Sequence, residues 1–255
     1  MINALKNRIF KNRINRINRT YNKSLENIIP NFQHLYDKSD AVKNEGCTEL
    51  EVNTNKLTAF ILSDIIPVVG ISPYPITEQL LMASAMVRFR PNCIFEWGTH
   101  LGISARIFHE VSKKYGVDAT IHSIDLPDEI DHIEHPGMNR GIKVKGINNV
   151  TLHQGDGLNK SIEVASSLSD SSKLLFFLDG DHEYNSVKRE LNGIYEKYPR
   201  AIILAHDTFY QSNESNYNIG PYLAVQDFLK YHPDNYKALS TNLGLPGMTL
   251  LYPTV

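Results

Sequence analysis

The sequence contains little cysteine and no long apolar run. Only Cys47 and Cys93 occur among 255 residues. Cys93 lies in a predicted buried strand, so we expect no disulfide framework and a reducing, cytoplasmic setting. No run of about eighteen apolar residues is present, so we expect no transmembrane helix. The composition, 42% hydrophobic and 21% charged, favours one α/β domain with an N-terminal extension.

Acidic residues are missing from the first 25 positions. Residues 1–25 contain seven Lys and Arg residues and therefore carry +7, so the remaining chain carries −9. Apolar residues recur there at helical spacing, which predicts a basic amphipathic helix over residues 1–29. Three roles stay open: docking on its own domain or a partner subunit of a homo-oligomer, peripheral membrane contact, or a nucleic-acid arm. Nucleic acid is the least expected partner, because interleaved stacking aromatics are missing.

The next segment, residues 30–75, has a weak pattern. Pro67, Pro73 and Pro75 are expected to break any long helix. We therefore expect a connector or cap near the functional site, followed by the main domain at residues 76–255.

The turn after the first predicted strand contains only part of a dinucleotide fingerprint. Residues 93–104 read Cys-Ile-Phe-Glu-Trp-Gly-Thr-His-Leu-Gly-Ile-Ser, and Asp125 ends the next predicted strand. An apolar strand that ends in an acid and a glycine turn is how an open α/β sheet presents a nucleotide site. His100 stands where G-x-G-x-x-G has its second glycine, which favours a ligand without a pyrophosphate. The acid at the head of the turn, Glu96, suits an amino-bearing ligand. An ordinary strand-turn-helix with a satisfied carboxylate is the alternative.

This segment resembles the first motif of class I S-adenosylmethionine-dependent methyltransferases. The form Glu-x-Gly-Thr-x-x-Gly-x-Ser is similar to the metal-dependent O-methyltransferase branch, with its catechol, macrocin and cephalosporin hydroxylase-like members. The resemblance covers residues 76–255 and implies an α/β, Rossmann-like fold: a mostly parallel seven-stranded sheet with an antiparallel C-terminal hairpin. It implies S-adenosyl-L-methionine as cofactor, with contacts from Glu96, Gly98, Thr99, His100, Gly102, Ser104, Asp125, Gly155, Asp156 and Asp179.

Within that set the roles divide along the cofactor. The turn that begins at Glu96 would receive the amino acid portion, Asp125 the ribose hydroxyls, and Gly155 with Asp156 the adenine. Asp156 has an alternative role as the cap of the following helix.

Strand and helix patterns alternate through the main domain as this fold requires. Strands are predicted at 94–97, 120–124, 149–153, 173–178, 201–205, 237–240 and 248–252. Helices are predicted at 77–88, 105–114, 161–167, 187–198 and 223–231.

Polar side chains follow two of these strands. Because adjacent parallel strands end at the same edge, Asp179, Asp181, His182, His206 and Asp207 are expected to converge there. The resemblance implies that Asp179, His206 and Asp207 hold a divalent metal, Mg²⁺ or Mn²⁺. His206 departs from the carboxylate usual there, which favours a softer metal, weak binding or none. Alternatively, His206 is a neutral imidazole that bridges Asp207 to the loop.

His182 lies where the resembled enzymes carry a general base. An imidazole suits that role near neutral pH, although a helix-capping or carboxylate-paired histidine is the alternative. We expect a metal-assisted O-methyltransferase that acts on a sugar, glycosylated metabolite or other polyhydroxyl molecule, with the acceptor held by loops 126–148 and 209–222. The other hypotheses are an iron-dependent hydroxylase-like enzyme and a non-catalytic nucleotide-binding module.

Overall fold

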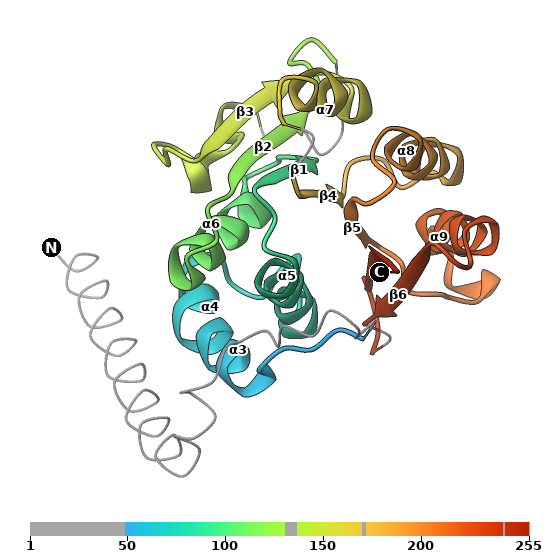
Figure 1. Cartoon of the computed structure of the whole chain (residues 1–255), viewed down its shortest axis with the longest axis horizontal. Helices are drawn as coiled ribbons and strands as arrows, with labels where there is room; N and C mark the ends of the chain where they lie inside the picture. Colours follow the sequence, from blue (N-terminus) through green and yellow to red (C-terminus); the bar gives the residue numbers. More distant parts are fainter. Residues whose placement is uncertain (1–48, 131–136, 170–171, 242, 255) are drawn as a thin grey trace, which may run out of the picture.

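The computed structural model describes residues 49–130, 137–169, 172–241 and 243–254. Its central feature is a seven-stranded sheet in the order β3-β2-β1-β4-β5-β7-β6 (Figure 1). The strands are β1 Cys93–Trp97, β2 Thr120–Asp125, β3 Val150–Gln154, β4 Leu174–Leu178, β5 Ile202–His206, β6 Tyr236–Ser240 and β7 Met248–Pro253. The first five pair in parallel, whereas β7 runs antiparallel to both β5 and β6. The predicted sheet with its antiparallel C-terminal hairpin is therefore confirmed.

Helices cover both faces of the sheet (Figure 1). One layer contains α3 Thr54–Phe60, the π-helical turn η2 Ile61–Ile65, α4 Ile66–Val69, α5 Ile76–Phe89 and α6 Ile103–Tyr115. The other contains α7 Gly157–Ala165, α8 Tyr184–Lys197 and α9 Gly220–Tyr231. Short 3-10 turns lie at η3 Gly137–Asn139, η4 Ile142–Val144 and η5 Asn213–Ser215.

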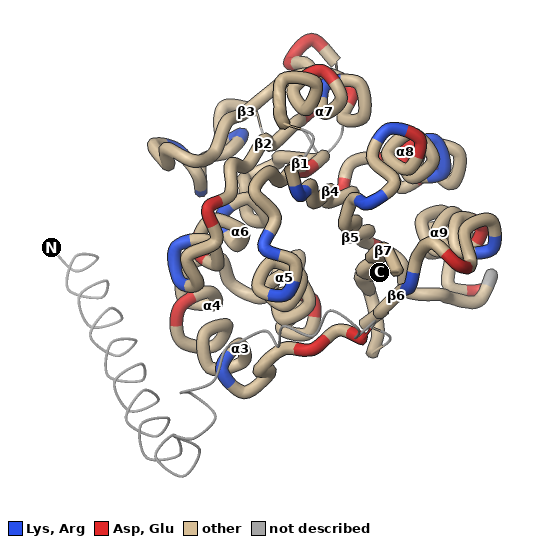
Figure 2. Tube along the Cα trace, in the orientation of Figure 1, with Lys and Arg blue, Asp and Glu red and all other residues tan. Residues whose placement is uncertain are grey.

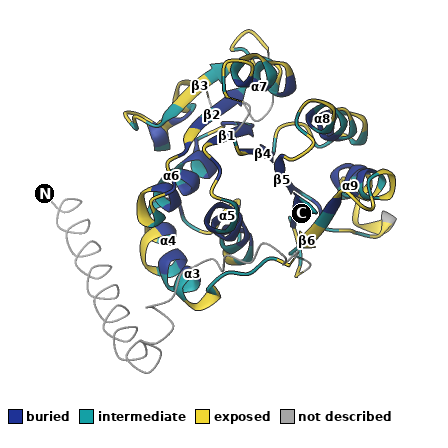
Figure 3. Ribbon diagram, viewed as in Figure 1, coloured by how far each residue is buried: buried dark blue, intermediate teal, exposed yellow. Residues whose placement is uncertain are grey.

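Side chains of successive strand residues point to opposite faces of the sheet, so each helix layer packs on its own hydrophobic core. In β4, Leu175 and Phe177 pack under α5 and α6, whereas Leu174, Phe176 and Leu178 face α8 and α9. Every residue of β4 is buried, as its continuous apolar run predicts for a central parallel strand. Figure 3 shows this buried sheet between helices that are exposed on their outer sides. Charged residues of both signs lie largely on those helices and the loops (Figure 2).

The segment before the main domain is more helical than its sequence pattern predicts. Residues 54–69 form α3, η2 and α4 without a gap, and Leu57, Ile61 and Ile65 are fully buried in the first core. The π-helical turn ends at Ile65, two residues before Pro67. Proline removes one backbone hydrogen bond, and a change of helical pitch accommodates that loss. The expectation that the prolines break any long helix was wrong for Pro67. The assignment of residues 30–75 as connector or cap stays a prediction.

Two expectations concern regions outside this description. Residues 1–48, which include the basic extension and Cys47, lie outside the described residues, whereas Cys93 is a free, buried thiol. Within the described part of the chain, no helix is both long and apolar enough to cross a lipid bilayer.

Candidate active site

Successive strands are added on one side of β1 up to β3 and on the other side from β4 onward, so the strand order reverses between β1 and β4. In open α/β sheets, ligands bind at the carboxyl ends of the strands at such a point. Gly98 has φ +92°, and a Cβ atom there would lie 2.2 Å from the carbonyl oxygen of Asp179. Only glycine permits this close approach of the two strand ends. Gly102 precedes α6 with φ +79°. His100 adopts φ +41°, so the residue in place of the second glycine still takes the left-handed conformation that glycine favours.

Glu96 lies beneath this turn and is fully buried. Ser123, its register partner on β2, donates to Glu96 Oε1 at 2.6 Å and lies 2.6 Å from the hydroxyl of Thr99. Burial raises the pKa of Glu96 to about 8, against the opposing effect of hydrogen bonds from Ser123 and Ser104. Glu96 is therefore neutral at physiological pH unless a cationic group approaches it.

Asp125 ends β2 at the lip of the same edge. Its Oδ2 accepts from the backbone N–H of His100 at 3.1 Å and lies 3.3 Å from Nε of Arg140. Arg140 also pairs with Asp128 at 2.5 Å. The loop that was expected to bind the acceptor therefore contacts the predicted ribose-binding carboxylate as well.

Asp156 is the N-cap of α7. Its Oδ1 accepts from the backbone N–H of Asn159 at 2.9 Å, and its Oδ2 accepts from Arg189 at 2.6 Å. This is the capping alternative, with the helix beginning at Gly157 rather than near residue 161. Gly155 has φ +137° and an open position for a Cβ, with only the Lys160 side chain within 4 Å. The adenine contact of Gly155 and Asp156 stays a prediction.

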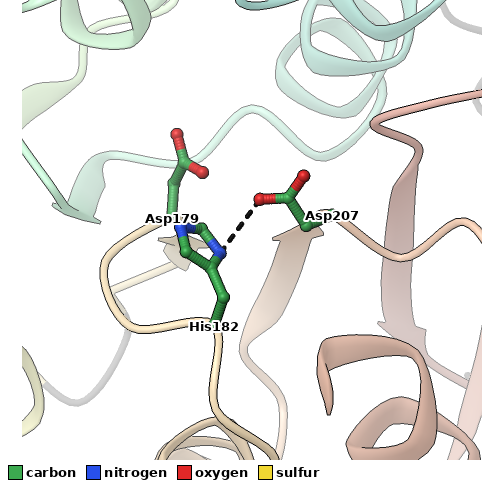
Figure 4. A group of neighbouring side chains, drawn as sticks. All are labelled: Asp179, His182 and Asp207. Carbon is green, nitrogen blue, oxygen red and sulfur yellow. Dashed lines mark ion pairs between the residues drawn. The ribbon is translucent and has the colours of Figure 1, made fainter. Parts of the chain in front are cut away.

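Three of the strand-end residues form a compact group (Figure 4). Asp179 follows β4, His182 lies in the loop before α8, and Asp207 follows β5, with ligand atoms that all lie within 4.8 Å of one another. His182 Nδ1 donates to Asp207 Oδ2 at 2.9 Å. By distance, this group is a candidate metal site. Asp181 is not in it, because its carboxylate accepts from Glu183 N–H and the Ser186 hydroxyl.

His206 lies beside both Asp179 and Asp207, as predicted, but its second ring nitrogen faces a third acid, and its role as a metal ligand stays a prediction. Its Nδ1 lies 2.8 Å from Asp179 Oδ1 and its Nε2 lies 3.0 Å from Glu78 Oε2, while the ring itself is only 5% exposed. Asp207 Oδ2 is 3.6 Å from Nδ1. Both ring nitrogens therefore face carboxylates, and His182 takes the place of His206 in the group that satisfies metal-ligand distances.

The electrostatics follow from these pairs. The hydrogen bond to Asp207 raises the pKa of His182 above its ordinary value, although partial burial opposes the rise. Burial disfavours a charged His206, but Asp179, Asp207 and Glu78 outweigh burial and raise its pKa well above the ordinary value. Burial also opposes ionisation of Asp207, yet hydrogen bonds from His182 and His206 lower its pKa strongly. The site therefore holds two imidazole groups beside the ionised carboxylate of Asp207.

Sequence reasoning missed two side chains at this site, Tyr74 and Glu78, and placed Tyr217 only in the acceptor loop. Tyr74 donates to Asp179 Oδ2 at 2.5 Å and Tyr217 donates to Asp207 Oδ1. Glu78, on the first turn of α5, also accepts from the backbone N–H of Gly247 at 2.8 Å. Glu78 carried one usable signal in the sequence, because it is an acid within a mainly apolar predicted helix. In the structure it is only 2% exposed. Tyr74 lies between two prolines and offered no such signal.

The loop after β5 packs against the His182 segment. Asn218 donates from Nδ2 to the backbone carbonyl of His182 at 2.8 Å and accepts from Gly220 N–H at 2.8 Å. A Cβ at Gly220 would lie 2.5 Å from that same carbonyl. The start of α9 and the loop before it therefore fix the backbone that carries the imidazole.

Comparison with known proteins gives three findings. A family model described as a methyltransferase domain matches residues 95–208. The uncharacterized protein y4gI of Sinorhizobium fredii is 28% identical over 137 residues, which are 53% of this chain but 15% of that protein. This chain therefore spans only a small part of the length of that curated relative.

Solved structures share the fold. The SAH-bound methyltransferase PaMTH1 of Podospora anserina is 15% identical with a TM-score of 0.51, over 90% of this chain and 96% of that one. The O-methyltransferase of Bacillus cereus in complex with SAH is 11% identical with a TM-score of 0.53, over 79% and 90%. At such identities the likeness concerns the fold. The likeness shows that this chain has the fold of class I methyltransferases, and the methyltransferase-domain match at residues 95–208 agrees with that fold.

Proposed function

We propose that this enzyme transfers the methyl group of S-adenosylmethionine to a hydroxyl group of a sugar, a glycosylated metabolite or another polyhydroxyl small molecule. The observation that carries the proposal is the His182–Asp207 pair, joined at 2.9 Å beyond the carboxyl ends of β4 and β5 (Figure 4). A histidine held by a carboxylate is an arrangement that accepts a proton from a hydroxyl nucleophile.

The residues present fit the cofactor. Asp125 offers a partly exposed carboxylate at the end of β2, within reach of the turn through the backbone N–H of His100. The glycine turn leaves no side chain at Gly98, and the N-terminus of α6 presents unpaired backbone N–H groups. Such a lip suits the ribose hydroxyls and the carboxylate of the amino acid portion. Glu96 and Asp179 supply acids on the side expected for the amino group.

The metal-ligand set predicted from the sequence does not fit a divalent ion. His206 would have to offer a free lone pair, but both of its ring nitrogens already lie at hydrogen-bond distance from the carboxylates of Asp179 and Glu78. The set that meets the distance requirement instead uses His182. A histidine bound to a metal cannot also accept the substrate proton, so the proposed mechanism uses no metal.

The chemistry then depends on the chain's own groups. Because Nδ1 of His182 donates to Asp207, the neutral ring carries its lone pair on Nε2. That atom accepts the acceptor's hydroxyl proton while the oxygen bonds to the methyl carbon. When bound, S-adenosylmethionine would supply that methyl group on a sulfonium, whose carbon–sulfur bond would break to leave a neutral thioether. Asp207 stabilises the imidazolium that His182 becomes.

The loop at residues 209–222 supports a hydroxylated acceptor. Its aromatic rings include Tyr210 and Tyr222, whose centroids lie 5.1 Å apart. Tyr210 is 56% exposed, and Asn218 joins the same loop to the His182 backbone. Aromatic faces beside polar groups suit the C–H faces and hydroxyls of a sugar better than a lipid tail.

The test is turnover by His182→Ala with a panel of nucleoside diphosphate sugars, methyl glycosides and catechol. We expect kcat to fall ~100-fold or more with an unchanged Kd for S-adenosylmethionine. His109→Ala is the matched control. His109 lies on α6 and pairs with Asn149, just before β3, away from the carboxyl ends of the strands. Wild-type turnover with none of these acceptors, despite tight cofactor binding, would favour a binding module. Unchanged turnover in His182→Ala would remove the proposed base.

A further inference from the structure

A buried, doubly bonded histidine lies beside the carboxylates that a metal would need. We propose that His206, held between Glu78 and Asp179, supplies the positive charge that a divalent ion would otherwise supply there, so that methyl transfer needs no metal. The inference rests on the proposed function. It assigns His206 and Glu78 as positioning residues that act through Asp179 and Asp207.

The first step concerns the hydrogen-bond partners of the two ring nitrogens of His206. His206 Nδ1 lies 2.8 Å from Asp179 Oδ1, and Nε2 lies 3.0 Å from Glu78 Oε2. Each of these two contacts needs one proton, and with the carboxylates as acceptors both protons lie on the ring. The other Glu78 oxygen already accepts from Gly247 N–H at 2.8 Å, as a carboxylate does. With two N–H groups, the ring is a cation without a lone pair for a metal.

The second step concerns the burial of the His206 and Glu78 side chains. The side chains of His206 and Glu78 are 5% and 2% exposed. Charges so far from water persist only when they are paired. Glu78 is therefore the partner that keeps a cationic ring stable at the end of β5. A cation fixed in this way also repels a second cation placed against the same carboxylates.

The third step concerns the carboxylates themselves. Asp179 Oδ1 faces His206 and its Oδ2 accepts from Tyr74 at 2.5 Å. Asp207 Oδ2 faces His182, with His206 at 3.6 Å, and its Oδ1 accepts from Tyr217. All four carboxylate oxygens thus have a protein donor, and the two acids can stay ionised side by side without a metal. Asp207 remains aligned for its role on His182.

The experiment measures metal binding directly, with the full chain after treatment with EDTA and with Mn²⁺ as the probe. Titration calorimetry should show no Mn²⁺ binding to the wild type, and methyl transfer should be the same with and without EDTA. His206→Asp removes the cation and adds a third carboxylate. We expect it to bind Mn²⁺ at least ~10-fold more tightly than the wild type and to require Mn²⁺ for turnover. His109→Asp adds an acid elsewhere and should bind no more Mn²⁺ than the wild type.

Stoichiometric Mn²⁺ binding by the wild type, or an EDTA-induced loss of turnover that Mn²⁺ restores, would overturn the inference. If His206→Asp does not fold, Glu78→Gln replaces it, since the amide oxygen still accepts from Nε2 but the paired charge is gone. This variant should gain Mn²⁺ affinity, and an unchanged affinity counts against the inference. If no acceptor is methylated, the proposed function fails, while the binding measurements still decide whether His206 excludes a metal.

Discussion

Replacing Asp207 with asparagine tests the pair on which the proposed mechanism depends. Asp207 adopts φ +55°, a left-handed conformation that asparagine tolerates as well as aspartate does. The substitution therefore removes the charge without adding backbone strain. Its target is the contact between Asp207 Oδ2 and His182 Nδ1 at 2.9 Å.

The magnitude follows from that contact. A hydrogen bond to a charged group contributes ~1.5–3 kcal/mol. We take the lower end, because the His182 side chain is 36% exposed and solvent screens the pair. In the wild type, Asp207 raises the pKa of His182, so the free base forms only above the ordinary histidine range. In Asp207→Asn, the rising limb of kcat against pH should move to lower pH.

The plateau should change as well. Asparagine can present its NH₂ group to Nδ1, which puts the proton on Nε2 and leaves the wrong tautomer for accepting a proton from substrate. We expect the plateau kcat to fall ~100-fold, while the Kd for S-adenosylmethionine stays constant. Stopped methyl-transfer assays with labelled cofactor between pH 6 and 10 would measure both effects.

Tyr217→Phe is the matched control. It removes the hydroxyl that donates to the other oxygen of Asp207. The carboxylate should then hold the His182 proton slightly more tightly, so the limb should stay in place or move to higher pH. A limb that is unmoved in Asp207→Asn, or that rises in pH as in the tyrosine variant, would refute the assignment of this pair.

Three other substitutions test the rest of the site. Gly98→Ala should lower stability by ~2 kcal/mol or more in thermal melts, because it combines φ +92° with a Cβ only 2.2 Å from a backbone oxygen; Gly116→Ala, with φ +59° and open space, should cost only ~1 kcal/mol. Burial raises the pKa of Glu96 and of Glu190 to about 8 each, so the folded state binds more protons than the unfolded state between about pH 4.5 and 8, and stability falls as pH rises through that window. Glu96→Gln should flatten the slope of Tm against pH by about as much as Glu190→Gln does, and an unchanged slope would contradict the buried protonated state. Asp125→Asn should weaken S-adenosylmethionine binding ~10-fold in calorimetry; an unchanged Kd would remove Asp125 from the ribose site.

The sheet and the convergence at its edge were predictable from local patterns. Buried strands such as β4 appear as continuous apolar runs, and parallel order brings their carboxyl ends together whatever the loops do. Helix starts were less predictable. Helix α7 begins at Gly157 and not near residue 161, because the cap is Asp156 and the helical apolar pattern becomes clear only one turn later. The spacing of apolar residues also failed to predict the continuous helical segment at residues 54–69.

The roles of individual side chains were less predictable than their positions. Asp179, His182 and Asp207 do meet, as strand order implies. Whether a strand-end histidine offers a lone pair depends on what lies behind it, and that partner comes from an element remote in sequence. Glu78 is 128 residues from His206, on a helix whose other buried residues are mainly apolar. No local pattern connects the two.

The buried acid behind His206 also explains why a histidine is tolerated at this strand end. A lone imidazole between Asp179 and Asp207 would either lose its charge to burial or leave one nitrogen without a partner. Glu78 supplies the second acceptor, and Gly247 N–H and the start of α5 hold Glu78 in place.

Histidine at position 206 and the acid at position 78 are therefore expected to change together. An imidazole without Glu78 loses its charge, and Glu78 without an imidazole is an unpaired buried anion. Each single variant, His206→Gln or Glu78→Gln, should be less stable than the double variant, in which both positions are neutral. A double-mutant cycle over these two substitutions measures the interaction free energy between the two side chains, which we expect to be ~2 kcal/mol or more. Additive losses would show that the two side chains are neighbours without forming an ion pair.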